Sequence, residues 1–289
     1  MPLVALATFA LAACTGTARQ PPARSAAPPP KPGASTSSTA SATPSTAPSP
    51  TAAATTTVPP ATGPLGPLGA VDGKTIVLDP GHNGGNFAHP SVINQLVFVG
   101  NGTKACDTTG TETDSGYTEA AFNFDVATRL ATLLEAAGAN VILTRPNNTG
   151  VGPCITQRAA IGNQAHAAVA ISIHADGGPP GGRGFQVLEP APIPGYNTAI
   201  VAPSDRLGLD VRRDFQAATG EEFSTYYGTD ALAVRSDLGG LNLSTVPKVF
   251  IECGNMRNST DAALLESPAY RQKIAQGLAQ ALADFLAGE

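Results

Sequence analysis

Three apolar, strand-like segments of the chain each lead directly into a residue that can bind a metal or move a proton. The segments ThrIleValLeuAspProGly, AlaValAlaIleSerIle and LysValPheIle precede His82, His174 and Glu252. In a parallel-type sheet the carboxyl ends of buried strands lie along one edge, where open α/β folds place their ligands. The sequence therefore predicts that these three residues, far apart in the chain, form one site.

Apolar periodicity alternates between strands and helices in the second part of the chain. Strands are predicted at residues 74–78, 140–144, 168–173, 185–188 and 248–251. Helical spacing marks Phe122, Val126 and Leu130, a segment at 156–167, a helix capped by Ser204 and ended near Gly220, and a C-terminal helix from Ile274 to Phe285. Residues 83–116, rich in Gly, Asn and Thr, are predicted to be a long loop. We expect one α/β domain with a mostly parallel or mixed twisted sheet flanked by helices.

The first 14 residues are apolar but far shorter than the roughly 20 residues that a membrane-spanning helix needs. We interpret them as an export signal, although no Lys or Arg precedes the apolar run. The end of this segment, Leu11-Ala12-Ala13-Cys14, resembles the lipobox of bacterial lipoproteins. Cys14 is therefore predicted to carry a lipid anchor. A plain secretory signal that contains a cysteine is the alternative.

Residues 15–69 consist mainly of Ala, Pro, Ser and Thr and show no hydrophobic periodicity. We predict a disordered linker, which would lift a folded domain away from a membrane. The folded part is predicted at residues 70–289, long enough for a single domain with a substantial core. We expect this domain to be monomeric and exported to the outer side of the cytoplasmic membrane, in a bacterial cell envelope.

Charge and composition exclude one class of partner. The formal net charge is −5, and the chain has no long basic run that could match nucleic-acid phosphates. We therefore expect no nucleic-acid partner.

Cysteine usage is consistent with export. Cys106 and Cys154 lie in Gly-, Thr- and Pro-rich sequence and are predicted to form a disulfide in an oxidising compartment. Cys253, within an apolar run, is predicted to be a buried thiol.

The three residues at the strand ends, together with Glu119 at the start of an amphipathic helix, form a set suited to zinc chemistry. Hydrolytic zinc sites commonly use three His or Glu ligands and leave one position for water, and His82, Glu119 and His174 satisfy that count. Glu252 is predicted to move protons as a general base and acid. Taken singly, each residue has a structural alternative: a histidine in a turn, a glutamate at a helix start, or a buried paired carboxylate. Their repeated setting after apolar runs favours one site.

Several neighbouring residues are candidates for supporting roles. Asp79, Asn83 and Ser172 are close enough in sequence to a ligand to orient it. A turn-forming role is the alternative, and it is the favoured one for Asp79-Pro80-Gly81. Asn83, Arg183 and Asn255 are predicted to contact substrate.

The motifs also identify a family. The runs IleValLeuAspProGlyHisAsnGly, GlyTyrThrGlu, AsnValIleLeuThrArg, IleSerIleHisAlaAsp and PheIleGluCysGlyAsnMetArgAsn, together with Arg158, Ala159 and Asn163, resemble the zinc-dependent N-acetylmuramoyl-L-alanine amidases of amidase type 3. The resemblance implies a single α/β domain that hydrolyses the amide between N-acetylmuramic acid and L-alanine of peptidoglycan. It also implies zinc ligands at His82, Glu119 and His174 and a catalytic glutamate at Glu252.

Some members of that family carry a helical insertion that blocks the site. The corresponding segment in this chain, residues 177–204, is short and rich in Gly and Pro. We therefore expect no such inhibition. Two other functions remain as alternatives: a non-catalytic peptidoglycan-binding lipoprotein, and a zinc peptidase that cuts within the stem peptide.

Overall fold

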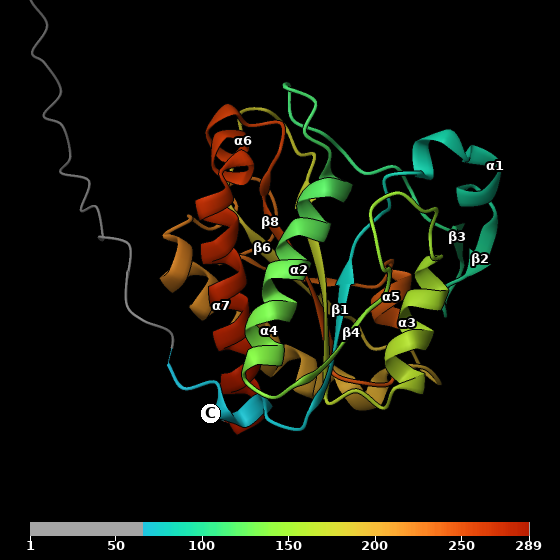
Figure 1. Ribbon diagram of the computed structural model, residues 1–289. Coiled ribbons are helices and arrows are strands. Elements are labelled where there is room, and N and C mark those ends of the chain that lie inside the picture. The colour runs from blue at the N-terminus through green and yellow to red at the C-terminus, as the bar shows by residue number, and fades with distance from the viewer. Residues whose placement is uncertain (1–65, 289) are drawn as a thin grey trace, which may run out of the picture. The chain divides into compact units, whose positions relative to one another are not determined.

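The computed structural model describes residues 66–288 (Figure 1). The predictions about the export signal, the lipid anchor at Cys14 and nearly all of the linker concern residues outside this range. Among the described residues, no helix combines the length and the apolar character needed to cross a membrane.

A six-stranded sheet forms the centre of the described region. Its strand order is β4 (Asn140–Leu143), β1 (Thr75–Pro80), β5 (Val169–Asp176), β8 (Lys248–Asn255), β6 (Gln186–Pro190) and β7 (Leu232–Arg235). The first four strands in this order are parallel to one another, β6 is antiparallel to β8, and β7 is parallel to β6. The predicted mostly parallel or mixed sheet flanked by helices is confirmed.

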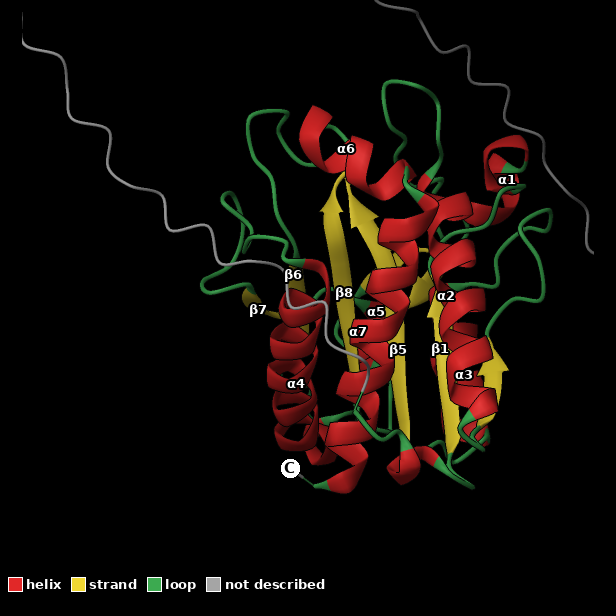
Figure 2. Ribbon diagram, turned by 60° about the vertical axis from the view of Figure 1, so that its left-hand side comes forward, coloured by secondary structure: helices red, strands yellow, loops and turns green. Residues whose placement is uncertain are grey.

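Helices cover both faces of the sheet. The long helices α2 (Glu119–Ala136), α4 (Val201–Thr219) and α7 (Pro268–Ala287) lie on one face, in front of the strands in Figure 2. The shorter α3 (Ile155–Gln164) and α5 (Gly239–Asn242) lie on the opposite face, as Figure 1 shows. The remaining helices are α6 (Ser259–Glu266), α1 (Pro90–Ile93) and three 3₁₀ turns, η1 (Gly69–Val71), η2 (Asn86–Ala88) and η3 (Thr198–Ile200).

The main core lies between the sheet and the three long helices. The predicted apolar stripe of α2 is fully buried at Phe122, Val126 and Leu130, and Ile274 and Leu278 of α7 are buried beside it. Each such side chain stabilises the fold by roughly 1.5–3 kcal/mol when it leaves water. Because the central strands are covered on both faces, they are continuous apolar runs rather than alternating ones.

A local capping signal determines where helix α2, which carries Glu119, begins. The Thr118 side chain accepts a hydrogen bond from the Ala121 backbone N–H, which makes Thr118 the N-cap. Glu119 is therefore the first helical residue. One predicted cap is wrong: α4 begins at Val201, and Ser204 lies inside its first turns, where its Oγ accepts from the Lys248 backbone N–H. The predicted end at Gly220 is confirmed, with that glycine at φ 72°.

The segment predicted as a long loop contains regular structure. Within residues 83–116, β2 (Leu96–Phe98) and β3 (Thr103–Ala105) form an antiparallel hairpin, preceded by η2 and α1. Strands of three residues with mostly exposed side chains carry no measurable alternation, so the sequence pattern could not reveal them. The hairpin lies on the α3 and α5 side of the sheet in Figure 1.

Candidate metal and catalytic site

The three predicted ligands converge. His82 follows β1, Glu119 opens α2 and His174 lies near the end of β5, and one donor atom from each lies within 4.8 Å of the other two. Glu119 Oε1 is 3.2 Å from His82 Nε2 and 2.8 Å from His174 Nδ1. The two imidazole rings meet edge to face, with centroids 4.9 Å apart. Two imidazoles and one carboxylate are a donor set that suits zinc and leaves a coordination position for water.

The electrostatics of these residues favour a positive charge at this point. Burial alone would lower the pKa of His82, but the carboxylates of Glu119 and Asp107 outweigh it and raise that pKa to about 10. Burial would raise the pKa of Glu119, yet His82 and His174 hold it well below its usual range. Burial lowers the pKa of His174 despite the neighbouring Glu119. A buried carboxylate between two imidazoles is a suitable environment for a bound cation.

The backbone at His82 is held in an uncommon conformation. His82 has φ 55°, a left-handed value that is rare for residues other than glycine. Such strain is maintained only where the surroundings over-determine it, and it concentrates at functional sites.

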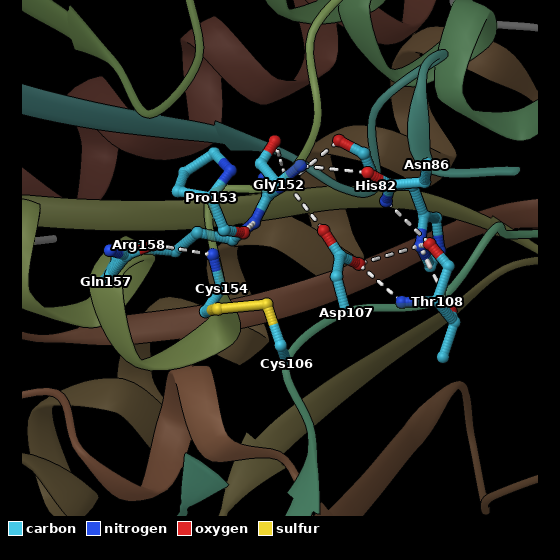
Figure 3. Close-up of a disulfide and its surroundings, with 10 residues drawn as sticks. All are labelled: His82, Asn86, Cys106, Asp107, Thr108, Gly152, Pro153, Cys154, Gln157 and Arg158. Carbon is cyan, nitrogen blue, oxygen red and sulfur yellow. Dashed lines mark hydrogen bonds and ion pairs between the residues drawn. A yellow bond between two sulfur atoms is a disulfide. The ribbon is translucent and has the colours of Figure 1, made fainter. Parts of the chain in front are cut away.

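Asp107 and Arg158 hold His82 from behind (Figure 3). His82 Nδ1 lies 3.3 Å from Asp107 Oδ1 and 3.1 Å from the Thr108 carbonyl oxygen. Arg158 Nη2 donates both to Asp107 Oδ2 at 3.1 Å and to the His82 carbonyl at 2.8 Å. A carboxylate on the second ring nitrogen fixes the tautomer and direction of a histidine ligand, which leaves Nε2 to face the cluster.

A disulfide joins the two segments that carry these residues. Cys106, the neighbour of Asp107, is bonded to Cys154, the N-cap of α3, and α3 carries Arg158 (Figure 3). The structure thus contains the disulfide that the sequence predicted. Cys253 is a free buried thiol, also as predicted. The covalent link keeps Asp107 beside Arg158. Because these two residues contact His82, the disulfide supports the position of His82 indirectly.

Below the cluster, Asp79 is not the simple turn residue that the sequence favoured. Its carboxylate accepts hydrogen bonds from Lys248 Nζ at 2.9 Å, Arg158 Nη1 at 3.0 Å and Ser172 Oγ at 2.7 Å. All of these side chains are buried. The network therefore ties β1, β5, β8 and α3 together directly beneath the predicted ligands.

Glu252 lies beside the cluster on the neighbouring strand. In the register of β5 and β8, Glu252 is paired with His174. Its Oε2 atom is buried and has no hydrogen-bond partner among the described residues. Burial, followed by the charges of Glu119 and Asp176, raises its pKa well above the usual range. A carboxyl group that readily holds a proton and has a free oxygen is suited to proton transfer.

A cavity of about 420 Å³ opens onto all four residues, His82, Glu119, His174 and Glu252. Phe250 forms part of its wall and stacks on the His174 ring, with centroids 3.9 Å apart. Lys104 of the hairpin and Asp237, which follows β7, also line the cavity. The cavity has room for a small part of an extended polymer.

The three residues predicted to contact substrate do not line this cavity. Arg183 donates to Glu221 and Asp261, and the Asn255 amide donates to the carbonyl oxygens of Pro179 and Gly182. Asn83 donates to the Gly152 carbonyl. Arg183 and Asn255 brace the 177–185 segment, and Asn83 braces the loop before α3.

Sequence reasoning missed Lys104, Asp107 and Asp237. Only Asp107 carried a usable signal, because it directly follows the cysteine predicted to be bonded. The other two lie in or next to elements too short to recognise.

Comparisons with known proteins agree with this geometry. Residues 76–284 match the family model described as N-acetylmuramoyl-L-alanine amidase. The chain is 42% identical over 217 residues to the N-acetylmuramoyl-L-alanine amidase Rv3717 of Mycobacterium tuberculosis, covering 75% of this chain and 88% of that protein. Among solved structures, the N-acetylmuramyl-L-alanine amidases Ami1 of Mycobacterium smegmatis and of Mycobacterium abscessus superpose with TM-scores of 0.71 and 0.70, each at 42% identity. These matches cover 76% and 75% of this chain and 99% and 100% of those chains.

Proposed function

The chain belongs to the N-acetylmuramoyl-L-alanine amidase family, and on this premise we propose that it is a zinc-dependent peptidoglycan amidase. The bond cleaved is the amide between N-acetylmuramic acid and L-alanine of the stem peptide. The observation that carries the proposal is the convergence of His82, Glu119 and His174 within 4.8 Å, with Glu252 paired to His174 across two strands.

In this proposal His82, Glu119 and His174 hold the zinc ion. When bound, zinc supplies Lewis acidity that makes a water molecule a far better nucleophile toward an amide. Glu252 Oε2, which is buried and unpaired, takes a proton from the attacking water and later delivers it to the departing amine of L-alanine. Asp107 and Arg158 keep His82 in the ligand orientation, and the Phe250 ring supports His174 from the cavity wall.

Digestion of purified muropeptides tests the reaction. The domain of residues 70–289 with zinc should release free stem peptides that begin with L-alanine, detected by mass. Cleavage between amino acids would instead identify a zinc peptidase, and zinc binding without any cleavage would identify a binding module. Removal of zinc by a chelator should abolish the release, and added zinc should restore it.

A substitution at Glu252 tests its role separately. Glu252→Gln should keep zinc and lose roughly 10²- to 10⁴-fold in rate, which is the usual contribution of proton transfer. Glu135→Gln removes an exposed carboxylate far from the cavity and serves as the matched control. Loss of zinc from Glu252→Gln would make Glu252 a ligand rather than a proton carrier.

We further propose that the enzyme acts in a bacterial cell envelope, in cell-wall turnover or daughter-cell separation. The proposal rests on the lipobox-like Leu11–Cys14 sequence and on the peptidoglycan substrate of the family. Cys14→Ala should move the expressed protein from the membrane fraction to the soluble fraction and abolish incorporation of labelled fatty acid. An unchanged distribution would contradict the lipid anchor and leave the amidase activity untouched.

A further inference from the structure

On the wall of the cavity that opens on the proposed zinc site, acidic side chains outnumber lysine and arginine side chains. Its carboxylates are Asp79, Asp107, Glu119, Asp176, Asp237 and Glu252. The lysine and arginine side chains on its wall are Lys104 and Arg158. Arg158 is 4% exposed, and its donors are directed to backbone carbonyls and to the carboxylates of Asp79 and Asp107. Lys104 is therefore the one of these two cations that an incoming ligand can reach, since 42% of its side chain is exposed.

Lys104 is held in place without being fully neutralised. It lies on β3, and its Nζ donates to the Asp237 carbonyl at 2.8 Å and lies 3.2 Å from Asp237 Oδ2. Asp237 also accepts from Arg235 Nε at 2.6 Å and from Arg235 Nη2 at 2.7 Å. Two cations thus share one carboxylate, which leaves the trio with one net positive charge. Because an ammonium group has three N–H donors, one donor of Lys104 is free for a ligand.

We propose that Lys104 is a specificity-determining residue that binds a carboxylate of the stem peptide. This inference rests on the proposed amidase function. An acidic group on the substrate meets the Asp176 carboxylate on the cavity wall, whereas Lys104 is an accessible cation that can pair with it. The free carboxylate of the residue that follows L-alanine is the chemistry that fits. Ala105, Ile155 and Leu238 also line the cavity and offer apolar contacts to the short aliphatic part of the peptide.

The backbone around Lys104 is rigid enough for this role. Asn101 and Lys104 of the hairpin both donate to backbone carbonyls of the 236–237 segment, and two residues after Lys104 the chain enters the Cys106–Cys154 disulfide. A fixed cation costs little ordering entropy when the substrate binds, so it contributes to affinity as well as orientation.

Two muropeptides that differ in a single group test the inference. One carries a free carboxylate on the residue after L-alanine, and in the other that carboxylate is amidated. Lys104→Met should lower kcat/KM for the free-carboxylate muropeptide roughly three- to tenfold. This loss lies between the loss expected for an exposed ion pair and that expected for a charge-assisted hydrogen bond. The amidated muropeptide should be cleaved by Lys104→Met and by the wild type at nearly equal rates. Lys104→Arg should keep the wild-type preference, and rising salt should weaken that preference in the wild type.

Lys74→Met is the matched control, because Lys74 is an exposed lysine before β1, at the opposite edge of the sheet from the cavity. Thermal unfolding of each variant verifies that it is folded. Equal losses on both muropeptides, or no loss on either, would overturn the role of Lys104 while leaving the amidase function intact. If the wild type releases stem peptide from neither muropeptide, the proposed function itself fails.

Discussion

Lys248 Nζ lies 2.9 Å from Asp79 Oδ2, and both side chains are almost completely buried. The two residues are 169 positions apart and lie on β8 and β1, with β5 between them. Burial would raise the pKa of Asp79, but Lys248 and Arg158 outweigh it and hold that pKa well below its usual range. Asp79 therefore carries its charge in the floor of the proposed zinc site, and loss of Lys248 removes one of its two cationic partners.

Lys248→Met should lower the free energy of unfolding by at most about 3–5 kcal/mol, the usual cost when a buried ion loses its partner, because Arg158 still pairs with Asp79. The double variant Asp79→Asn with Lys248→Met should recover part of this loss, because it removes both charges of the pair. Urea unfolding of both variants measures the difference, with Lys74→Met as the exposed control. A loss below about 1 kcal/mol would show that water reaches the pair.

The disulfide near His82 offers a second test of stability. Replacing both Cys106 and Cys154 by Ser should lower the free energy of unfolding by roughly 2–4 kcal/mol, because the unfolded chain regains the freedom of a long loop. A reductant should destabilise the wild type by a similar amount and leave the double variant unchanged. Equal sensitivity of the two proteins to reductant would mean that another thiol reaction causes the effect.

Asp107→Asn tests whether Asp107 positions the proposed ligand His82. Loss of the carboxylate behind a histidine ligand typically weakens metal affinity about 10- to 100-fold. Competition with a chromogenic chelator measures zinc affinity directly, without reference to activity. Asp114→Asn removes a carboxylate whose side chain is 82% exposed and pairs with Arg257 at the surface. This variant should bind zinc like the wild type. Equal affinities for all three proteins would exclude a positioning role for Asp107.

Glu189 on β6 predicts a pH dependence of stability that is independent of the metal site. Burial, with the charge of Asp205, raises the pKa of Glu189 to about 7 against the opposing effect of Arg212. Between the ordinary value of 4.5 and about 7, the folded protein holds a proton that the unfolded chain releases. Rising pH therefore favours the unfolded chain, so this contribution to stability is complete below 4.5 and lost above about 7.

The measurement is the free energy of unfolding of the wild type minus that of Glu189→Gln, from pH 5 to pH 8. The difference should fall steadily as the pH rises, because the glutamine cannot ionise. Glu135→Gln, at an exposed position, controls for the general loss of a carboxyl group. A flat or rising difference would mean that Glu189 is ionised in the folded protein.

The sequence predicted the residues whose local setting is informative. His82 follows the buried strand β1, His174 and Glu252 lie in the C-terminal halves of β5 and β8, and Glu119 follows a capping threonine, so short segments were sufficient to group them. Contacts between segments far apart in the chain had no comparable sequence signal. Lys104 reaches the cavity only because a hairpin of three-residue strands packs against the segment after β7. Asp79 looked like a turn residue because its partner Lys248 comes from a distant strand.

The same contrast explains why Arg183 and Asn255 were predicted to contact substrate. Both are polar residues near site strands, which is all that the sequence shows. In the structure their donors are directed to Asp261 and to the carbonyl oxygens of Pro179 and Gly182. These hydrogen bonds give both residues a supporting role in the walls beside the site, and their contact with substrate stays a prediction.

Gly81 provides the sharpest test of the proposed site. A Cβ atom at Gly81 would lie 1.9 Å from His174 Cε1 and 2.1 Å from His174 Nε2, so the imidazole would have to leave its place. Gly81→Ala should therefore abolish most zinc binding and amidase activity. Gly69→Ala, where a Cβ meets nothing within 4 Å, should retain both. Zinc affinity by chelator competition and thermal unfolding of the metal-free proteins distinguish the outcomes. Wild-type zinc affinity in a folded Gly81→Ala variant would exclude His174 as a ligand.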